Sequence, residues 1–384
     1  MAFTDTGAAN DGALAGLKVV SMAEQFPGPF CTMILSDMGA DVIQVERPGS
    51  GDPSRFLKSF YESLNRNKRS IAIDARDPEQ KAQLLDLIAA ADVFIEGFRP
   101  GKLAKLGLGY DDLKRINPNL IYTSISGYGQ TGPYRMRPAH DLTFQGLGGA
   151  LDERVEGAVS GLPPKLLMGD SVSGLYAVIG ILGALTARDR TGKGTYVDVA
   201  MSDAVLSLQT PFIAADREND DRPPQADPGY EMYQTSDGRW LTTSIAHENA
   251  YWDQLCRDVG LEEGVGLLRD ERVARRAELV AKIGARILAK PYSHWEAVFD
   301  ASGQMWGPAL TRGDLPSDPQ LQSRGNFAEV TRKDGETQLV LRQPIKFSAF
   351  ENVSVRRAPS VGEHQGEGFG ISPSVQERPK RTGS

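Results

Sequence analysis

Cysteine is scarce in this 384-residue chain, which contains only Cys31 and Cys256. The two cysteines lie far apart, and the sequence has no CxxC pair and no Cys/His cluster. This pattern argues against a disulfide framework and against a structural zinc site. Low cysteine usage is typical of proteins that work in a reducing compartment, so we predict a cytoplasmic location.

A basic excess is also missing, because the formal net charge is −7 and the isoelectric point is about 5.3. This balance argues against a nucleic-acid-binding surface, although it is compatible with a local basic patch for an anionic ligand. No uncharged apolar run reaches 18 residues, so no membrane span is expected. The apolar stretch 175–187 is interpreted as a buried helix. The first twelve residues lack the basic and apolar regions of a signal peptide.

Short apolar runs rich in β-branched residues alternate with helical patterns in the first half of the chain. The predicted strands are 17–22, 41–46, 69–74, 93–96 and 120–126, and the predicted helices include 30–38 and 77–91. Pro78 directly follows Asp77 and suits the first position of its helix. Strands that alternate with helices at this spacing predict an α/β fold with a Rossmann-like, doubly wound and mostly parallel sheet.

The length of the chain exceeds the usual limit of one hydrophobic core, so two domains are predicted. A polar, charged and proline-rich linker, 216–228, separates a large domain, 14–215, from a smaller α+β domain, 229–330. Within the smaller domain, two runs in 233–244 are joined by Asp-Gly, which predicts a hairpin, and residues 269–288 are predicted to form one long helix. Residues 331–384 are expected to return to the large domain and to end in a disordered tail, and residues 1–13 are also expected to be disordered.

The predicted sheet lacks the glycine fingerprints of nucleotide-binding proteins. No GxGxxG follows the first strand and no GxxxxGK[ST] occurs, which argues against NAD and ATP. Cations instead flank the strands, at Arg47, Lys68, Arg69, Arg99 and Lys105. If the strands are adjacent, these cations gather at strand ends and can hold the phosphates of a mobile ligand. Any one of them alone is more often a solvated surface charge.

Three ionisable residues are candidates for catalysis. His140 precedes Asp141 in a loop and suits an oriented base, although by itself the pair is better explained by a capping Asp141. Asp170 precedes a buried helical pattern, so helix N–H groups would stabilise its anion; a simple N-cap is an equally good explanation. Glu248 follows the predicted hairpin and on local grounds is an exposed glutamate in a first helical turn.

These segments together resemble the family III CoA-transferases and α-methylacyl-CoA racemases, a group that includes carnitine and formyl-CoA transferases. The resemblance runs through most of the chain and rests on ordered motifs: PGP at 27–29, LSDMGADVI at 35–43, ERPG at 46–49, FRPG at 98–101, GYGQTGP at 127–133, GDS at 169–171 and APSVGEH at 358–364. It implies a Rossmann-like large domain, a small domain and an interlocked homodimer. It also implies that the five cations hold coenzyme A as an acyl-CoA substrate, with no metal or redox cofactor.

The resemblance implies two alternative reactions at Asp170. In the transferases the matching Asp attacks the thioester, forms an anhydride and then an enzyme-CoA thioester, and a small carboxylic acid accepts CoA. In the racemases the same Asp works across a 2-methylacyl-CoA from a His that matches His140, which pairs with a Glu that matches Glu248. We favour the transferase mainly because transferases dominate this family, and because 171–174 and 144–149 are transferase-like; the racemase stays second. A non-catalytic CoA-binding protein is a third, less favoured reading.

Overall fold

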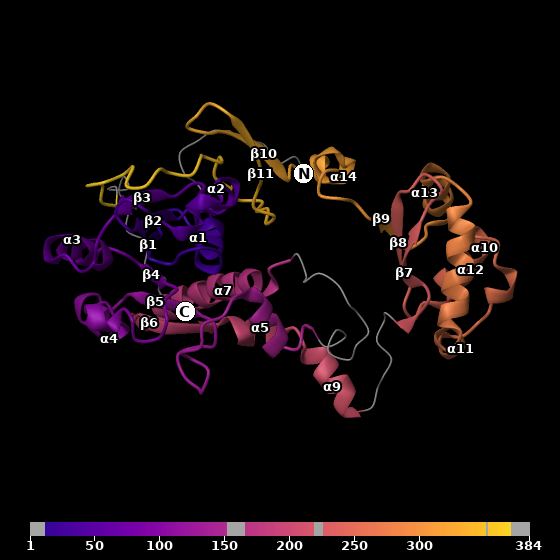
Figure 1. The fold of residues 1–384 in the computed structure, drawn as a ribbon, viewed down its shortest axis with the longest axis horizontal. Helices are drawn as coiled ribbons and strands as arrows, with labels where there is room; N and C mark the ends of the chain where they lie inside the picture. The colour runs from indigo at the N-terminus through magenta and orange to yellow at the C-terminus, as the bar shows by residue number, and fades with distance from the viewer. Residues whose placement is uncertain (1–11, 152–165, 219–225, 351, 370–384) are drawn as a thin grey trace, which may run out of the picture. The chain divides into compact units, whose positions relative to one another are not determined.

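The chain forms two compact units in the computed structural model, which describes residues 12–151, 166–218, 226–350 and 352–369 (Figure 1). The first unit comprises Met1–Pro211 and Gly325–Ser384, and the second comprises Phe212–Arg324. Most of the predicted disordered termini, and the middle of the predicted linker, lie outside the described residues.

A six-stranded sheet organises the first unit, with the strand order β3-β2-β1-β4-β5-β6. Its strands are β1 (Lys18–Ser21), β2 (Asp41–Glu46), β3 (Arg69–Ala72), β4 (Val93–Glu96), β5 (Ile121–Ser126) and β6 (Thr195–Ala200). All neighbouring strands in it pair in parallel, which confirms the predicted α/β class. The order runs outward in both directions from β1 and β4. The topological switch point therefore lies between these two strands, where open α/β sheets bind ligands beyond the carboxyl ends.

Helices cover both faces of this sheet, so its central strands are buried on both sides. On one face, α1 (Pro27–Asp37), α2 (Lys58–Asn65) and α7 (Met168–Thr191) pack against Val19, Val93 and Ile121. On the other face, α3 (Pro78–Ala89) and α4 (Tyr110–Ile116) pack against Val20 and Phe94. Every residue of β4 and β5 is buried, as expected for central parallel strands.

Helix α7 is the central helix of the first face and extends beyond the predicted stretch 175–187 at both ends. Among the described residues it is the one helix long and apolar enough, by length and composition, to cross a membrane. Its buried side chains, including Ala177, Val178 and Ile181, belong to the core with α1 and the sheet. We therefore interpret α7 as a core helix, although the prediction of a buried helix holds for only one of its faces, because Leu175, Tyr176 and Ile179 are exposed.

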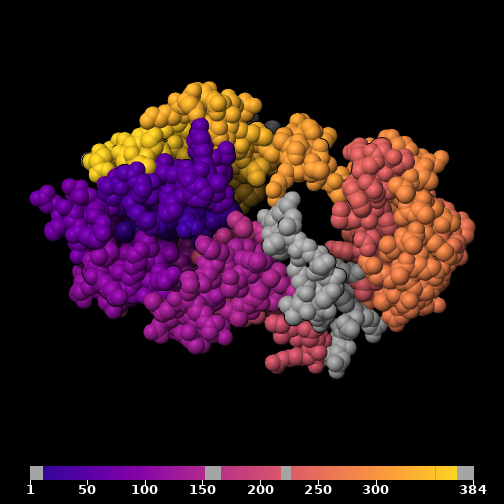
Figure 2. Space-filling view, in the orientation of Figure 1, coloured from indigo at the N-terminus to yellow at the C-terminus, as the bar shows by residue number. Residues whose placement is uncertain are grey.

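The first unit is completed by shorter elements. These are α5 (Asp141–Leu147), α8 (Met201–Ser207), and the antiparallel hairpin of β10 (Phe327–Thr331) and β11 (Thr337–Leu341); α9 (Thr210–Glu218) crosses the boundary between the units. The C-terminal segment lies along the edge strand β3: the His364 N–H donates to Ser70 O at 2.9 Å, and Ser70 N–H donates to His364 Nδ1 at 3.2 Å. This segment, yellow in Figure 2, thereby covers an otherwise unpaired sheet edge.

The second unit contains a three-stranded antiparallel sheet and a helical layer. The strands are β7 (Tyr230–Gln234), β8 (Trp240–Ser244) and β9 (Trp306–Pro308), and the helices are α10 (Asn249–Asp258), α11 (Arg269–Ala274), α12 (Arg276–Leu288), α13 (Tyr292–Ser302) and α14 (Pro319–Ser323). Pairing of β7 with β8 confirms the predicted hairpin. The single helix predicted over 269–288 is wrong, because the backbone leaves helical geometry at Arg275.

A buried ion pair joins two distant segments of the second unit. Arg272 and Asp227 are fully buried, and the Arg272 guanidinium donates to Asp227 Oδ2 at 2.8 and 2.9 Å. Arg272 also donates to Asn249 Oδ1 at 2.7 Å and lies 5.2 Å from the centre of the Trp252 ring. One buried arginine therefore holds both the segment before β7 and the first residue of α10.

Candidate active site

Asp170 lies in the first turn of α7, beside the start of α1. The neighbouring Gly174 is packed so closely that a Cβ atom there would lie 2.9 Å from both Pro27 O and Phe30 Cδ1. Residues 170 and 174 are one helical turn apart and share a face of α7. Since α1 follows β1 at the switch point of the sheet, Asp170 stands at the crevice where this fold class binds ligands.

The Asp170 backbone is held by a second, buried carboxylate. Asp141 is 7% exposed, and its Oδ1 accepts the Asp170 N–H at 3.2 Å. The Gln145 side-chain amide donates to Asp141 Oδ2 and also to Leu166 O at 3.2 Å. A Cβ atom on Gly169 would lie 3.2 Å from both Asp141 Oδ1 and Phe144 Cβ, so the start of α7 packs closely against α5. Asp141 is therefore a positioning residue, rather than only the cap considered from the sequence.

Burial, and to a smaller extent the charge of Asp141, raises the pKa of the Asp170 carboxyl to about 7. The sequence predicts that helix N–H groups stabilise the anion, but the N-cap residue of α7 is Leu167, and both burial and the charge of Asp141 favour the neutral Asp170 carboxyl. Near neutral pH the carboxyl is thus divided between its two protonation states. A carboxylate poised in this way is reactive enough to act as a nucleophile or as a base.

Replacing Asp141 with Asn is expected to move the pH dependence of the reaction towards acid. In the wild type, kcat/KM should fall about tenfold per pH unit below pH 7, because only the Asp170 anion reacts. Asn keeps an oxygen that can accept the Asp170 N–H but removes the negative charge, so the pKa of Asp170 should decrease. The measurement is kcat/KM against pH for both enzymes. An unchanged inflexion in D141N, with D189N at the exposed far end of α7 as control, would contradict this electrostatic coupling.

His140 and Glu248, the other predicted catalytic residues, lie in different units. His140 is the N-cap residue of α5, and its exposed side chain has no hydrogen bond to the described residues. Glu248 precedes α10 and accepts the N–H groups of Ala246 at 2.9 Å and His247 at 3.0 Å. These backbone hydrogen bonds lower the pKa of Glu248 and keep it ionised. A joint role of His140 and Glu248 stays a prediction.

Three of the five predicted ligand-binding cations follow carboxyl ends of strands next to the switch point. Arg47 follows β2, and Arg99 and Lys105 follow β4. All three side chains are exposed. Arg47 forms an ion pair of 2.6 Å with Glu24, whereas Arg99 and Lys105 have no ion pair among the described residues. This edge of the sheet therefore presents cations on both sides of β1.

The remaining two cations are engaged by the protein. Lys68 is buried, and its Nζ donates to Asn65 Oδ1 at 2.8 Å and to Pro29 O at 2.9 Å. Burial lowers the pKa of Lys68 to about 7. Arg69 opens β3 and pairs with Asp41, the first residue of β2, at 2.6 Å. Contacts of these two residues with a ligand stay predictions, but here both charged ends bind protein groups.

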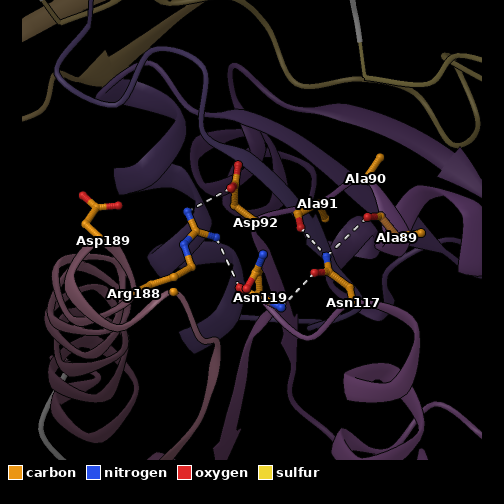
Figure 3. A pocket seen from close by; sticks show the side chains of 9 residues that line it. Ala89, Ala90, Ala91, Asp92, Asn117, Asn119, Arg188 and Asp189 are labelled. Carbon is orange, nitrogen blue, oxygen red and sulfur yellow. Dashed lines mark hydrogen bonds and ion pairs between the residues drawn. The ribbon is translucent and has the colours of Figure 1, made fainter. Parts of the chain in front are cut away.

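A hollow of about 400 Å³ lies at the other end of the strands, where β4 and β5 begin (Figure 3). Its lining includes Asp92, which precedes β4, and Asn119, which precedes β5. Arg188 crosses it, pairing with Asp92 at 3.0 Å and donating to Asn119 O at 3.3 Å (Figure 3). Arg188 is 18 residues from Asp170 along α7, which is roughly 27 Å at 1.5 Å per residue. The hollow is thus not part of the Asp170 site.

Comparison with known proteins agrees with this geometry. Residues 14–365 match CoA-transferase family III. The chain is 32% identical to succinyl-CoA:glutarate CoA-transferase of Homo sapiens, covering 91% of this chain and 84% of the relative. It is 33% identical to acetyl-CoA:oxalate CoA-transferase of Acetobacter aceti, covering 93% and 95%. The crystal structure of a CAIB/BAIF family protein from Brucella suis matches with a TM-score of 0.80 at 33% identity, covering 92% and 97%. The chain therefore belongs to CoA-transferase family III, whose members use acyl-CoA substrates, and is an acyl-CoA:carboxylate CoA-transferase.

Proposed function

We propose that Asp170 is the nucleophile of the transfer. Its carboxylate attacks the thioester carbonyl of the donor. The C–S bond then breaks, CoA leaves as a thiolate, and the acyl group stays on Asp170 as a mixed anhydride. The thiolate then attacks the Asp170 carbonyl, which releases the donor acid and leaves an enzyme-CoA thioester. The acceptor carboxylate repeats these two steps in reverse order, which regenerates Asp170 and gives the new acyl-CoA.

The observation that supports this proposal is the fixed backbone of Asp170 beside the start of α1. This backbone is held by buried Asp141, and the helix turn of Asp170 is packed against the start of α1. Helix α1 has no side-chain cap, and both Pro27 and Pro29 lack an N–H. The Gly28 N–H in this first turn is therefore our candidate donor to the oxyanion that forms on the thioester.

The acceptor is proposed to be a small carboxylic acid, with dicarboxylic acids as the first class to test. Two of the relatives described above are named for glutarate and oxalate as substrates. Arg47, Arg99 and Lys105 are proposed to hold the phosphates of CoA, because they are exposed at strand ends around the crevice. Lys68 and Arg69 are proposed to contribute only if ligand binding releases them from their present partners.

We also propose that the active enzyme is a cytoplasmic homodimer with interlocked subunits. Leu175, Tyr176 and Ile179 on α7 are 46%, 40% and 61% exposed, although they belong to the longest helix of the unit. Large apolar side chains exposed together mark a surface that another protein covers. A second copy of the chain would supply the cover, and Glu248 of the second unit would then belong to the assembled site.

The proposed reaction is tested by one incubation in deuterated water, with a panel of acyl-CoAs and free carboxylates analysed by mass spectrometry. Transfer predicts that CoA moves to a new carboxylate and that no deuterium enters the α-carbon. The alternative reaction, racemisation of a 2-methylacyl-CoA by Asp170, His140 and Glu248, predicts α-deuterium while CoA stays on its acyl group. That second outcome would overturn the proposed function.

A further inference from the structure

The turn between β1 and α1 places a carboxylate, Glu24, inside the cationic edge of the sheet. Glu24 follows β1, which lies between β2 and β4 in the sheet. The Glu24 Oε2 is 2.6 Å from a guanidinium nitrogen of Arg47. The positive charge of Lys102, which follows β4, also lowers the pKa of Glu24. A glutamate therefore stands between the cations of β2 and of β4, at the switch point where an anionic ligand would enter.

The backbone of this turn is fixed. Gln25 has a φ of 69°, a left-handed conformation that is uncommon for residues other than glycine. The Gln25 N–H donates to Asp52 Oδ2 at 3.0 Å, and Asp52 is 1% exposed. Ala23, on the other side of Glu24, packs so closely against Gly28 that a Cβ atom on this glycine would lie 2.1 Å from the Ala23 Cβ. The Glu24 side chain is therefore presented from a rigid support.

The two partners of this ion pair differ in their freedom to move. The Arg47 side chain is 55% exposed, whereas the Glu24 side chain is 16% exposed. The guanidinium can consequently swing towards solvent or towards a ligand, while the carboxylate stays in the crevice. The Lys102 Nζ lies 4.1 Å from the centre of the Phe98 ring, and its charge also favours the Glu24 anion.

We propose that Glu24 is a built-in competitor for the anion site of Arg47, occupying the guanidinium in the free enzyme and recapturing it when CoA departs. Phosphate and carboxylate bind guanidinium in the same way, so only one of them can hold Arg47 at a time. Glu24 would thus weaken CoA binding and favour release of the acyl-CoA product. Partial burial raises the pKa of Glu24, whereas the charge of Arg47 lowers it, so the Glu24 anion is favoured most while Arg47 is its partner. The inference rests on the proposed binding of CoA phosphates by Arg47.

The test is the affinity of the full-length protein for CoA, measured by calorimetry at low salt. E24Q is expected to bind CoA about five- to tenfold more tightly than the wild type, because it keeps the side-chain shape without the competing charge. R47Q is expected to bind CoA more weakly, and E24Q/R47Q should bind like R47Q alone. E329Q, which makes the same charge change at an exposed position of β10, should match the wild type.

The possible failures are distinguishable. If R47Q weakens binding but E24Q does not strengthen it, the competitor role of Glu24 is wrong and CoA binding at Arg47 stands. If R47Q binds CoA as the wild type does, the placement of CoA at Arg47 is wrong, and the inference about Glu24 is overturned with it. Equal tightening by E24Q and E329Q would show a general charge effect and would also overturn the inference.

Discussion

Substitution of Asp170 by Asn is expected to lower CoA transfer by at least about 10,000-fold. Asn fills the same space and keeps the backbone N–H that Asp141 holds, but it has no carboxylate to attack a thioester. No covalent intermediate can then form, and the residual rate reflects binding alone. The measurement is the initial rate of CoA transfer in a coupled assay, together with intact-protein mass spectrometry after incubation with acyl-CoA. D189N, at the exposed far end of the same helix, is the matched control and should keep wild-type activity.

The same substitution should stabilise the protein at pH 8. The pKa of Asp170 is raised from 3.8 to about 7, so the folded state binds more protons than the unfolded state between these values. Stability therefore falls as pH rises from about 4 to about 7, and the deficit persists above that range. Asn removes a deficit of roughly 2 to 4 kcal/mol. A D170N protein that is less stable than the wild type at pH 8 would contradict this electrostatic account.

Substitution of Arg272 by Met is expected to destabilise the second unit by about 3 to 5 kcal/mol. Met approximates the volume of the side chain but leaves the Asp227 carboxylate fully buried, with the Gly229 N–H at 2.9 Å as its remaining hydrogen-bond donor in the described structure. An uncompensated buried charge costs far more than the loss of an exposed ion pair. The measurement is the denaturant midpoint, or the melting temperature, of the transition that reports this unit.

Two variants make this expectation specific. R275M removes a nearby exposed ion pair with Glu278 and should change stability by less than about 1 kcal/mol. R272M/D227N removes both buried charges and should recover a substantial part of the loss, because the penalty comes from the unpaired partner. If R272M is as mild as R275M, the buried pair does not stabilise the unit in the way its geometry indicates.

The central strands were predictable because they are buried on both faces and therefore rich in apolar, β-branched residues. The local composition of IYTSIS in β5 and of DVIQVE in β2 is enough to predict a strand. β6 was missed because TYVDVA mixes polar and apolar residues, and this edge strand is buried only at its end. The break at Arg275 was also missed, since the sequence there reads as continuous helix and the buried contacts of Arg272 are formed by distant residues.

Asp170 could be identified because its signal is local: an acidic residue at the start of an apolar helix. Its support by Asp141 could not, because that contact spans 29 residues and looks like an ordinary cap in the sequence. The cations show the same limit. Sequence position brings Arg47, Lys68 and Arg69 near strand ends, but it does not tell which of them already has a protein partner. In the structure these partners are Glu24 for Arg47, Asn65 for Lys68 and Asp41 for Arg69.

The claim that CoA transfer passes through an Asp170 anhydride is tested most directly with an acceptor carboxylate labelled with ¹⁸O. When the acceptor attacks the enzyme-CoA thioester and the anhydride is then cleaved by CoA, one acceptor oxygen remains on Asp170. Mass spectrometry of the peptide that contains Asp170 should therefore show incorporation of one ¹⁸O after a single turnover, with enzyme in excess over donor, and a second ¹⁸O on repeated turnover. Formation of the new acyl-CoA with no label in that peptide would contradict the account.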